Sequence, residues 1–133
     1  MNIEALFQEA RKAASFAYAP YSKFRVGAAL LGEDGTVYTG CNVENRSFGL
    51  TICAERSALV QGVSKGTRRF TALAIAAPDS QEPVGPCGAC RQVLSEFMPP
   101  DAPVIFGGAG TRRITVTIGE LIPFDSLHDL AEG

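Results

Sequence analysis

Three cysteines have the types and spacing of ligands to one metal ion. Cys87 and Cys90 are separated by two residues, and Cys53 lies upstream at the start of another helical pattern. Residues three apart in the first turn of a helix emerge on one side, so the sulfur atoms of Cys87 and Cys90 can share a tetrahedral ion. The spacing predicts a metal site with zinc as the favoured ion, although thiolates also bind iron.

The chain offers no evident fourth protein ligand for this ion. Cys41 falls in a strand pattern, where a small buried thiol is the ordinary occupant. His128, the single histidine, lies in a polar segment near the C-terminus that we predict as a helix, and we expect it at the surface. Three sulfur ligands leave one position open to water, which is typical of a catalytic zinc site.

Two charged residues beside Cys53 could complete the chemistry of such a site. Glu55 should point near the ion without binding it, and a carboxylate there can take a proton from water and pass it on. Arg56 could donate hydrogen bonds to the ligand sulfur atoms and offset their negative charge, together with the two helix N-termini. The alternatives are an exposed helix glutamate and a solvated helix arginine.

These residues need a framework that brings two helix starts together. The periodicity of apolar residues predicts helices over residues 3–17, 53–63 and 88–98, and strands over residues 24–31, 36–42, 70–77, 104–106 and 114–118. The first two strands should form a hairpin, because the Asp34-Gly35 step between them accepts a positive φ.

The connections between the later elements predict the topology of the sheet. Strands 70–77 and 104–106 should be parallel with a right-handed crossover, and strand 114–118 should return antiparallel because residues 107–110 are too few for a crossover. The result is an α/β fold, a three-layer α/β/α sandwich with a mixed five-stranded sheet, in a single domain over residues 1–133. If parallel strands deliver both helices to one edge of the sheet, the helix starts converge there.

Composition argues against several classes of function. Hydrophobic residues make up 46% and charged residues 20% of the 133 residues, and the formal net charge is -2. This acidic balance argues against nucleic acid as a partner. No stretch approaches the roughly 20 apolar residues of a membrane span, and the N-terminus lacks the pattern of a secretory signal. We therefore expect a cytoplasmic protein without membrane attachment.

The pairing of Cys-x-Glu with Pro-Cys-x-x-Cys is the signature of zinc-dependent nucleobase deaminases. At these residues the sequence resembles the small homotetrameric cytidine deaminases, and the similarity runs from residues 20–24 through residues 42–45 to residues 121–123. The resemblance implies the cytidine deaminase-like fold, one Zn2+ per subunit and a homotetramer. It also implies hydrolysis of free cytidine and 2'-deoxycytidine to uridine, 2'-deoxyuridine and ammonia, a reaction of pyrimidine salvage.

The resemblance also implies a role for each residue of the site. Zinc would be bound by the three cysteines, and Glu55 would be the proton shuttle. Asn42 and Glu44 would hold the ribose hydroxyl groups, which is consistent with their alternate positions in a strand pattern. Phe24 would stack on the pyrimidine. Val43 and Ala54 complete the predicted nucleoside site.

Two aromatic residues are candidates for contacts between subunits. Phe48 lies between the predicted ribose-binding strand and Cys53, and Phe124 lies in the tail. The tail differs from that of the family, because Phe124 follows Pro123 directly where the family usually has two further residues. The homotetramer itself follows from the resemblance alone.

Three other functions could use the same cysteines. A deaminase of a modified cytosine nucleoside, of the blasticidin type, would use the same zinc chemistry, but Asn42 and Glu44 favour an ordinary ribose. A non-catalytic binding module stabilised by zinc would need no acid group at the open position, and Glu55 argues against it. A deaminase that edits nucleic acid would need a basic groove, and the net charge of -2 argues against one.

Overall fold

A mixed five-stranded sheet forms the centre of the protein, with its strands in the order β2-β1-β3-β4-β5. The computed structural model describes residues 1–125, so the predictions for His128 and its helix lie outside the described residues. The strands are β1 (Gly27–Gly32), β2 (Val37–Cys41), β3 (Phe70–Ala76), β4 (Pro103–Gly107) and β5 (Arg113–Thr117). The helices are α1 (Ile3–Ala14), η1 (Phe48–Leu50), α2 (Ala54–Ser64), α3 (Gly88–Ser95) and α4 (Ile118–Leu121).

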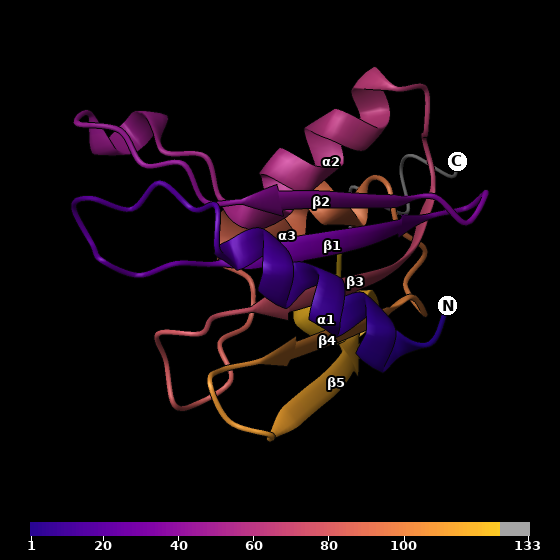
Figure 1. Ribbon diagram of the computed structural model, residues 1–133. Helices are drawn as coiled ribbons and strands as arrows, with labels where there is room; N and C mark the ends of the chain where they lie inside the picture. Colours follow the sequence, from indigo (N-terminus) through magenta and orange to yellow (C-terminus); the bar gives the residue numbers. More distant parts are fainter. Residues whose placement is uncertain (126–133) are drawn as a thin grey trace.

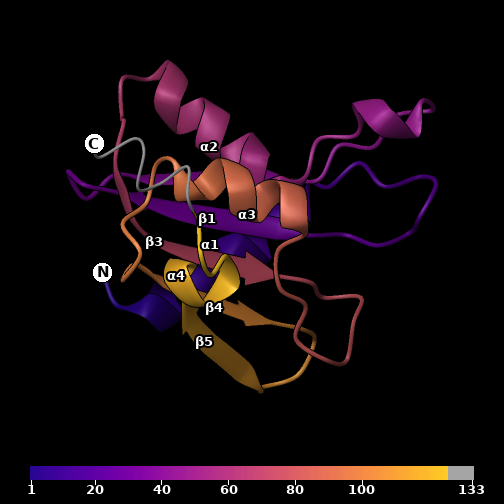
Figure 2. The same cartoon turned by 180° about the vertical axis from the view of Figure 1, so that it is seen from behind.

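Helices cover both faces of this sheet, as predicted. Figure 1 shows α1 in front of the sheet, and Figure 2 shows α2, α3 and the short α4 on the opposite face. This confirms the predicted three-layer α/β/α arrangement around a mixed five-stranded sheet. Strand β3 is buried on both sides, with Leu73 and Ile75 packed towards α2 and α3, and Ala72, Ala74 and Ala76 packed towards α1.

The strand directions explain how two helices come to start at one edge of the sheet. Strands β3 and β4 are parallel and β5 returns antiparallel, as predicted. Strands β2 and β3 are both antiparallel to β1, so they run in the same direction and end at the same edge. Helix α2 follows β2 and helix α3 follows β3. The prediction that the parallel pair, β3 and β4, delivers both helices is therefore wrong, because β2 leads to α2 and β4 leads to β5. The two helices still start at one edge of the sheet, as predicted.

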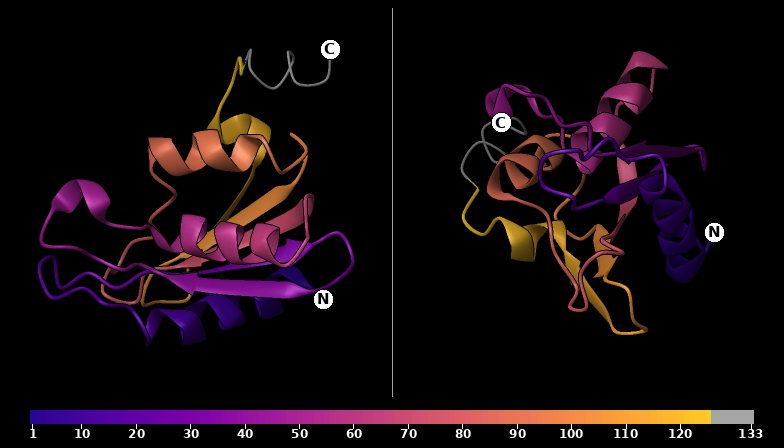
Figure 3. Two further views of the ribbon diagram at one scale, coloured as in Figure 1. Left: turned by 90° about the horizontal axis from the view of Figure 1, so that it is seen from above. Right: turned by 60° about the vertical axis from the view of Figure 1, so that its left-hand side comes forward.

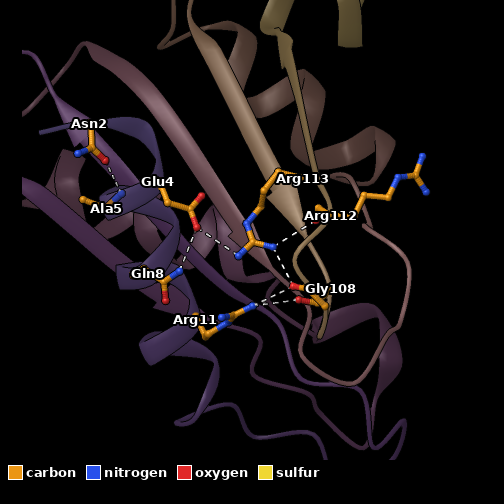
Figure 4. A network of polar contacts seen from close by, with 9 residues as sticks. Asn2, Glu4, Ala5, Gln8, Arg11, Gly108, Arg112 and Arg113 are labelled. Atoms are coloured by element: carbon orange, nitrogen blue, oxygen red, sulfur yellow. Dashed lines mark hydrogen bonds and ion pairs between the residues drawn. The ribbon is translucent and has the colours of Figure 1, made fainter.

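Polar contacts attach α1 to the far edge of the sheet. Figure 4 shows Arg11 and Arg113 converging on the loop around Gly108, where Arg11 Nη2 lies 3.4 Å from the carbonyl oxygen. Arg113 forms an ion pair with Glu4 at 3.2 Å, and its guanidinium lies 3.8 Å from the centre of the Phe7 ring. Strand β5 therefore has two supports: its backbone pairs with β4, and the side chain of Arg113 joins it to α1.

The first helix is shorter than its apolar pattern predicts. The predicted helix over residues 3–17 ends at Ala14, because the hydroxyl of Ser15 donates to the carbonyl oxygen of Lys12 at 2.7 Å. Such bonds from serine compete with the helical ladder and favour its end.

The first strand starts later than predicted. Its predicted range was 24–31, but β1 begins at Gly27. The amide group of Asn42 bonds to the carbonyl oxygen of Phe24 and to the backbone N–H of Val26, both at 2.8 Å. Side-chain hydrogen bonds thus replace regular strand pairing over these residues.

The C-terminal part contains one helix that the sequence analysis missed. The predicted strand over residues 114–118 ends at Thr117, and Ile118 begins α4. The hydroxyl of Thr117 accepts from the backbone N–H of Glu120, and the Glu120 carboxylate accepts from the backbone N–H of Thr117. This capping box was readable as Thr-x-x-Glu. The predicted helix over residues 88–98 also ends early, at Ser95.

Two loops project together beyond one end of the sheet. They are residues 18–26, before β1, and residues 42–53, between β2 and α2, and they lie side by side in Figure 1 and in both views of Figure 3. Backbone bridges from Val43 to Tyr18 and to Ile52 hold these loops together. Within residues 1–125, no helix has the length and apolar character needed to cross a membrane.

Candidate active site and metal centre

The three predicted cysteine ligands lie together at the starts of two helices. Cys53 is the N-cap residue of α2, Cys87 is the N-cap residue of α3, and Cys90 follows one turn later. The three Sγ atoms lie within 4.8 Å of one another, and those of Cys87 and Cys90 are 3.4 Å apart. Cys41 lies in β2 outside this cluster and is half-buried, in a strand as predicted.

These sulfur atoms fit a tetrahedral zinc ion. A Zn–S bond of about 2.3 Å implies a separation of roughly 3.8 Å between two sulfur ligands, which lies within the range of the cluster. The N-terminal dipoles of α2 and α3 point their positive ends at Cys53 and Cys87, which favours thiolates there. No fourth cysteine, histidine or carboxylate joins the cluster among residues 1–125.

The two cysteines of α3 differ in their tendency to ionise. Burial and the nearby charge of Glu55 raise the pKa of the Cys90 thiol. Burial also acts on Cys87, but hydrogen bonds from the backbone and side chain of Cys90 outweigh it and lower the pKa of the more exposed Cys87 thiol. Cys87 is therefore the first of the pair to become a thiolate.

Arg56 reaches the metal cluster from the first turns of α2. Its Nη2 donates to the Sγ of Cys53 at 3.2 Å. The bond to Cys53 is the main reason that the pKa of Arg56 is raised, so the guanidinium stays charged. The structure thus places Arg56 in contact with the sulfur atom of one predicted ligand, Cys53. Its role in charge compensation stays a prediction.

Glu55 lies beside the cluster and is shielded from solvent. It is only 5% exposed, and burial raises the pKa of its carboxyl group, partly offset by its backbone N–H and by the charge of Arg56. A carboxyl group whose pKa is raised holds a proton more readily than an exposed one, which favours a role in general acid–base chemistry.

A cavity of about 200 Å³ opens directly onto Glu55 and two of the cysteines. Its walls come from the start of α2, the loop before α3, strand β3, and the segments next to β1 and β2. The lining residues are Val26, Asn42, Thr51, Cys53, Ala54, Glu55, Ile75, Val84, Gly85 and Cys87.

The sequence analysis named only part of this lining. It missed Thr51, which lies two residues before Cys53, and Val84 and Gly85, which lie just before Cys87. The available signal was their position directly before metal ligands in the chain. Val26 and Ile75 carried no signal, because apolar residues in strand patterns are usually core.

Asn42 and Glu44 both turn towards the segment before β1. Asn42 is buried and bonds to the backbone of Phe24 and Val26. The carboxylate of Glu44 accepts from the backbone N–H groups of Tyr21 at 3.0 Å and Ser22 at 3.1 Å, and also bonds to the Ser22 hydroxyl. The hydrogen bonds from Ser22 are the main cause that lowers the pKa of Glu44.

Only some of the other residues predicted to contact the nucleoside line this cavity. Ala54 lines it, whereas Phe24 and Val43 are absent from its lining among the described residues. Glu44 lines a neighbouring cavity of about 410 Å³ with Tyr21, Ser22, Phe48 and Thr51, and Thr51 borders both cavities.

Comparison with known proteins identifies the family of this chain. The family model described as the cytidine and deoxycytidylate deaminase zinc-binding region matches residues 1–106. The chain belongs to this family. The prediction of a zinc-dependent deaminase of the cytidine deaminase type is thereby confirmed, and the three cysteines are compatible with one zinc ion per subunit.

Individual deaminases are similar to this chain over most of its length. A cytidine deaminase from Sporosarcina psychrophila is 50% identical over 92% of this chain and 90% of its own. The crystal structure of cytidine deaminase from Burkholderia pseudomallei has a TM-score of 0.89 at 44% identity and covers 93% of this chain and 98% of its own. A blasticidin-S deaminase from Bacillus cereus is more distant, at 35% identity over 77% of this chain and 76% of its own.

Phe48 and Phe124, the two aromatic residues predicted at subunit contacts, are both exposed. Phe48 is 76% exposed and lies on the projecting loops, where its ring meets the edge of Tyr21 at a centroid distance of 6.1 Å. Phe124 is fully exposed and adopts a positive φ of 58° directly after Pro123. Large exposed aromatic side chains are typical of surfaces that bind another protein.

Proposed function

We propose that this protein hydrolyses free cytidine and 2'-deoxycytidine to uridine and 2'-deoxyuridine with release of ammonia. The observation that carries the proposal is the shared cavity: the buried carboxyl of Glu55, the sulfur atoms of Cys53 and Cys87, and the amide of Asn42 all border it. A buried acid–base group beside a three-sulfur metal site, facing a polar side chain suited to a sugar hydroxyl, meets the needs of nucleoside hydrolysis.

The chain's own residues supply the proton transfers. A zinc ion bound by Cys53, Cys87 and Cys90 provides a Lewis acid that makes water acidic enough to act as a nucleophile. Glu55 accepts a proton from the attacking water and delivers it to N3 of the cytosine ring. It then accepts the remaining proton from the new hydroxyl group on C4 and delivers it to the amine, which leaves as ammonia while C4 becomes the carbonyl carbon of uridine. Arg56 neutralises part of the thiolate charge, which would otherwise weaken the Lewis acid.

The nucleoside sits between the metal side and the segment before β1 in this proposal. Asn42 keeps one amide N–H and one oxygen lone pair beyond its two backbone bonds, which suits a ribose hydroxyl group. Glu44, in the adjoining cavity, takes the other hydroxyl, and Thr51 borders both positions. Phe24 lies against the base, with Val43 and Ala54 completing the site.

We further propose that the protein is a cytoplasmic homotetramer that serves pyrimidine salvage. The exposed aromatic side chains of Phe48 and Phe124 support burial against neighbouring subunits. Reduced cysteines are needed to bind the metal, and the described cysteines are free, which suits the reducing cytoplasm. Light scattering on the purified protein should give a tetramer, and Phe48→Ser should lower its mass.

Deamination by purified protein tests the proposed reaction directly. Protein with one zinc per chain should release ammonia from cytidine and 2'-deoxycytidine, with uridine and 2'-deoxyuridine as the products. Blasticidin S serves as the comparison substrate, and faster turnover of it than of cytidine would assign the other substrate class. Zinc-loaded protein that releases no ammonia from any of these nucleosides would disprove the proposal.

A further inference from the structure

The cavity wall formed by residues 24–26 is held by side chains in addition to one backbone hydrogen bond, from the N–H of Asn42 to the carbonyl oxygen of Val26 at 3.1 Å. Asn42 binds this segment from one side, through the carbonyl oxygen of Phe24 and the backbone N–H of Val26. The residue between them, Arg25, faces Asp79 on the other side. Val26 and Asn42 both line the cavity, so any shift of this segment changes its shape.

Asp79 makes three hydrogen bonds to Arg25, and one of them is to the backbone. Its Oδ2 accepts from the backbone N–H at 2.8 Å and from Nε at 3.0 Å, and its Oδ1 accepts from Nη2 at 2.7 Å. The side-chain and backbone hydrogen bonds lower the pKa of Asp79 to about 2, so the carboxylate is charged at neutral pH. Two parallel N–H···O bonds fix direction as well as distance, which single contacts do not.

Asp79 also belongs to the loop that forms the opposite wall of the cavity. This loop, residues 77–86, joins β3 to α3, carries Val84 and Gly85 into the lining, and ends directly before Cys87. Its own position is set by the backbone N–H of Ala109, which donates to the Ser80 carbonyl oxygen at 2.7 Å. The bonds of Asp79 therefore tie two walls of one cavity together.

We propose that Asp79 is a positioning residue that sets the spacing between the wall of residues 24–26 and the loop of residues 77–86, and thereby the affinity for the nucleoside. The inference rests on the proposed function. It assigns Asp79 no contact with the reacting atoms, so the spacing should affect binding of substrate more than the chemical step.

A second ion pair on the same loop provides the matched comparison. Arg112 and Glu82 are joined at 2.6 Å and, like Asp79 and Arg25, are not among the described residues that line the cavity, but their side chains are 67% and 74% exposed. The side chain of Asp79 is only 27% exposed, and it holds a backbone group in addition to a side chain. If the Asp79–Arg25 pair only joined two surface side chains, removing it would change KM no more than removing the Glu82–Arg112 pair.

Steady-state kinetics with cytidine on zinc-loaded protein separates these possibilities. Asp79→Ala should raise KM about tenfold and change kcat less than about twofold, as expected when binding alone is weakened. Arg25→Ala should have a smaller effect on KM, about threefold, because the bond from the backbone N–H to Asp79 survives. The double variant should resemble Asp79→Ala, since both substitutions remove the same interaction. Glu82→Ala should leave KM unchanged.

Each outcome either supports the proposal or overturns it. Asp79→Asn, which keeps an oxygen acceptor for the backbone N–H of Arg25, should lie between the wild type and Asp79→Ala, and it replaces that variant if Asp79→Ala fails to fold. A KM within twofold of the wild type in both Asp79 variants, or an equal change in Glu82→Ala, overturns the inference, as does a fall in kcat that matches the rise in KM. Wild-type turnover of cytidine is read separately, so failure of the proposed function is not confused with failure of this inference.

Discussion

The metal side of the cavity and the wall opposite it are positioned by different means. Cys53 and Cys87 are N-cap residues, so α2 and α3 place them through regular backbone structure close in sequence. The wall of residues 24–26 is placed by the side chains of Asn42 and Asp79, which are 16 residues from Val26 and 54 from Arg25 respectively. The metal side therefore depends on secondary structure, and the wall depends on long-range hydrogen bonds.

This difference separates the chemistry from the recognition of the substrate. Groups placed on helix starts above a buried sheet are held rigidly, which suits metal ligands and a proton shuttle. A wall held by a few hydrogen bonds can change its spacing without disturbing the ligands. Substitutions on the two sides should consequently have different signatures, in zinc content and kcat on one side and in KM on the other.

The largest effect is expected from removing a buried metal ligand. Cys90→Ser should abolish deamination, lower the zinc content to near zero and reduce the melting temperature, because binding of such a metal is coupled to folding. Metal analysis and thermal unfolding measure these changes. Cys41→Ser, outside the cluster, is the matched control and should keep its zinc. Full zinc occupancy in Cys90→Ser would remove Cys90 from the ligand set.

The next effect in size concerns Glu55, the proposed proton shuttle on the same side. Glu55→Gln should lower kcat by roughly 10²- to 10⁴-fold, the usual contribution of positioned proton transfer, while zinc content stays unchanged. Stopped assays of ammonia release together with metal analysis test this. Turnover near the wild-type rate in the glutamine variant would show that another group moves the protons.

On the opposite wall, Asn42→Ala should affect both stability and binding. The substitution leaves the carbonyl of Phe24 and the N–H of Val26 without their partner, and we expect a loss of roughly 2 to 4 kcal/mol in the free energy of unfolding for two such groups. KM for cytidine should rise while zinc is retained. Asn45→Ala, on the exposed part of the same loop, serves as the control. Loss of zinc from Asn42→Ala would contradict the independence of the two sides.

The smallest effect tests how the loop of residues 77–86 is supported. A Cβ at Gly108 would overlap the Ser80 carbonyl oxygen and lie 2.8 Å from that of Glu82, so Gly108→Ala should destabilise the protein by about 1 to 3 kcal/mol. Nothing lies within 4 Å of a Cβ at Gly110, and Gly110→Ala should unfold at nearly the wild-type urea concentration. Equal unfolding curves for the two variants would show that the backbone around Gly108 can shift to accommodate a Cβ atom without loss of stability.

Much of the fold and the metal side followed from local patterns. Apolar periodicity, the Asp34-Gly35 turn and the short connection after β4 predicted the elements and their directions, because each depends on residues close in sequence. The spacing of Cys53, Cys87 and Cys90 predicted the cluster for the same reason, once two helices started at one edge. The capping box before α4 was equally local and was overlooked.

By itself, the amino-acid sequence determined which residues could bind a metal and move protons, and which segments would be helix or strand, since those properties depend on side-chain chemistry and near neighbours. Only the tertiary structure decided that β2 and β3 deliver the two helices, that β1 begins at Gly27, and that Asp79 bonds to Arg25. These arrangements depend on contacts between residues far apart in the chain, whose partners no local pattern specifies.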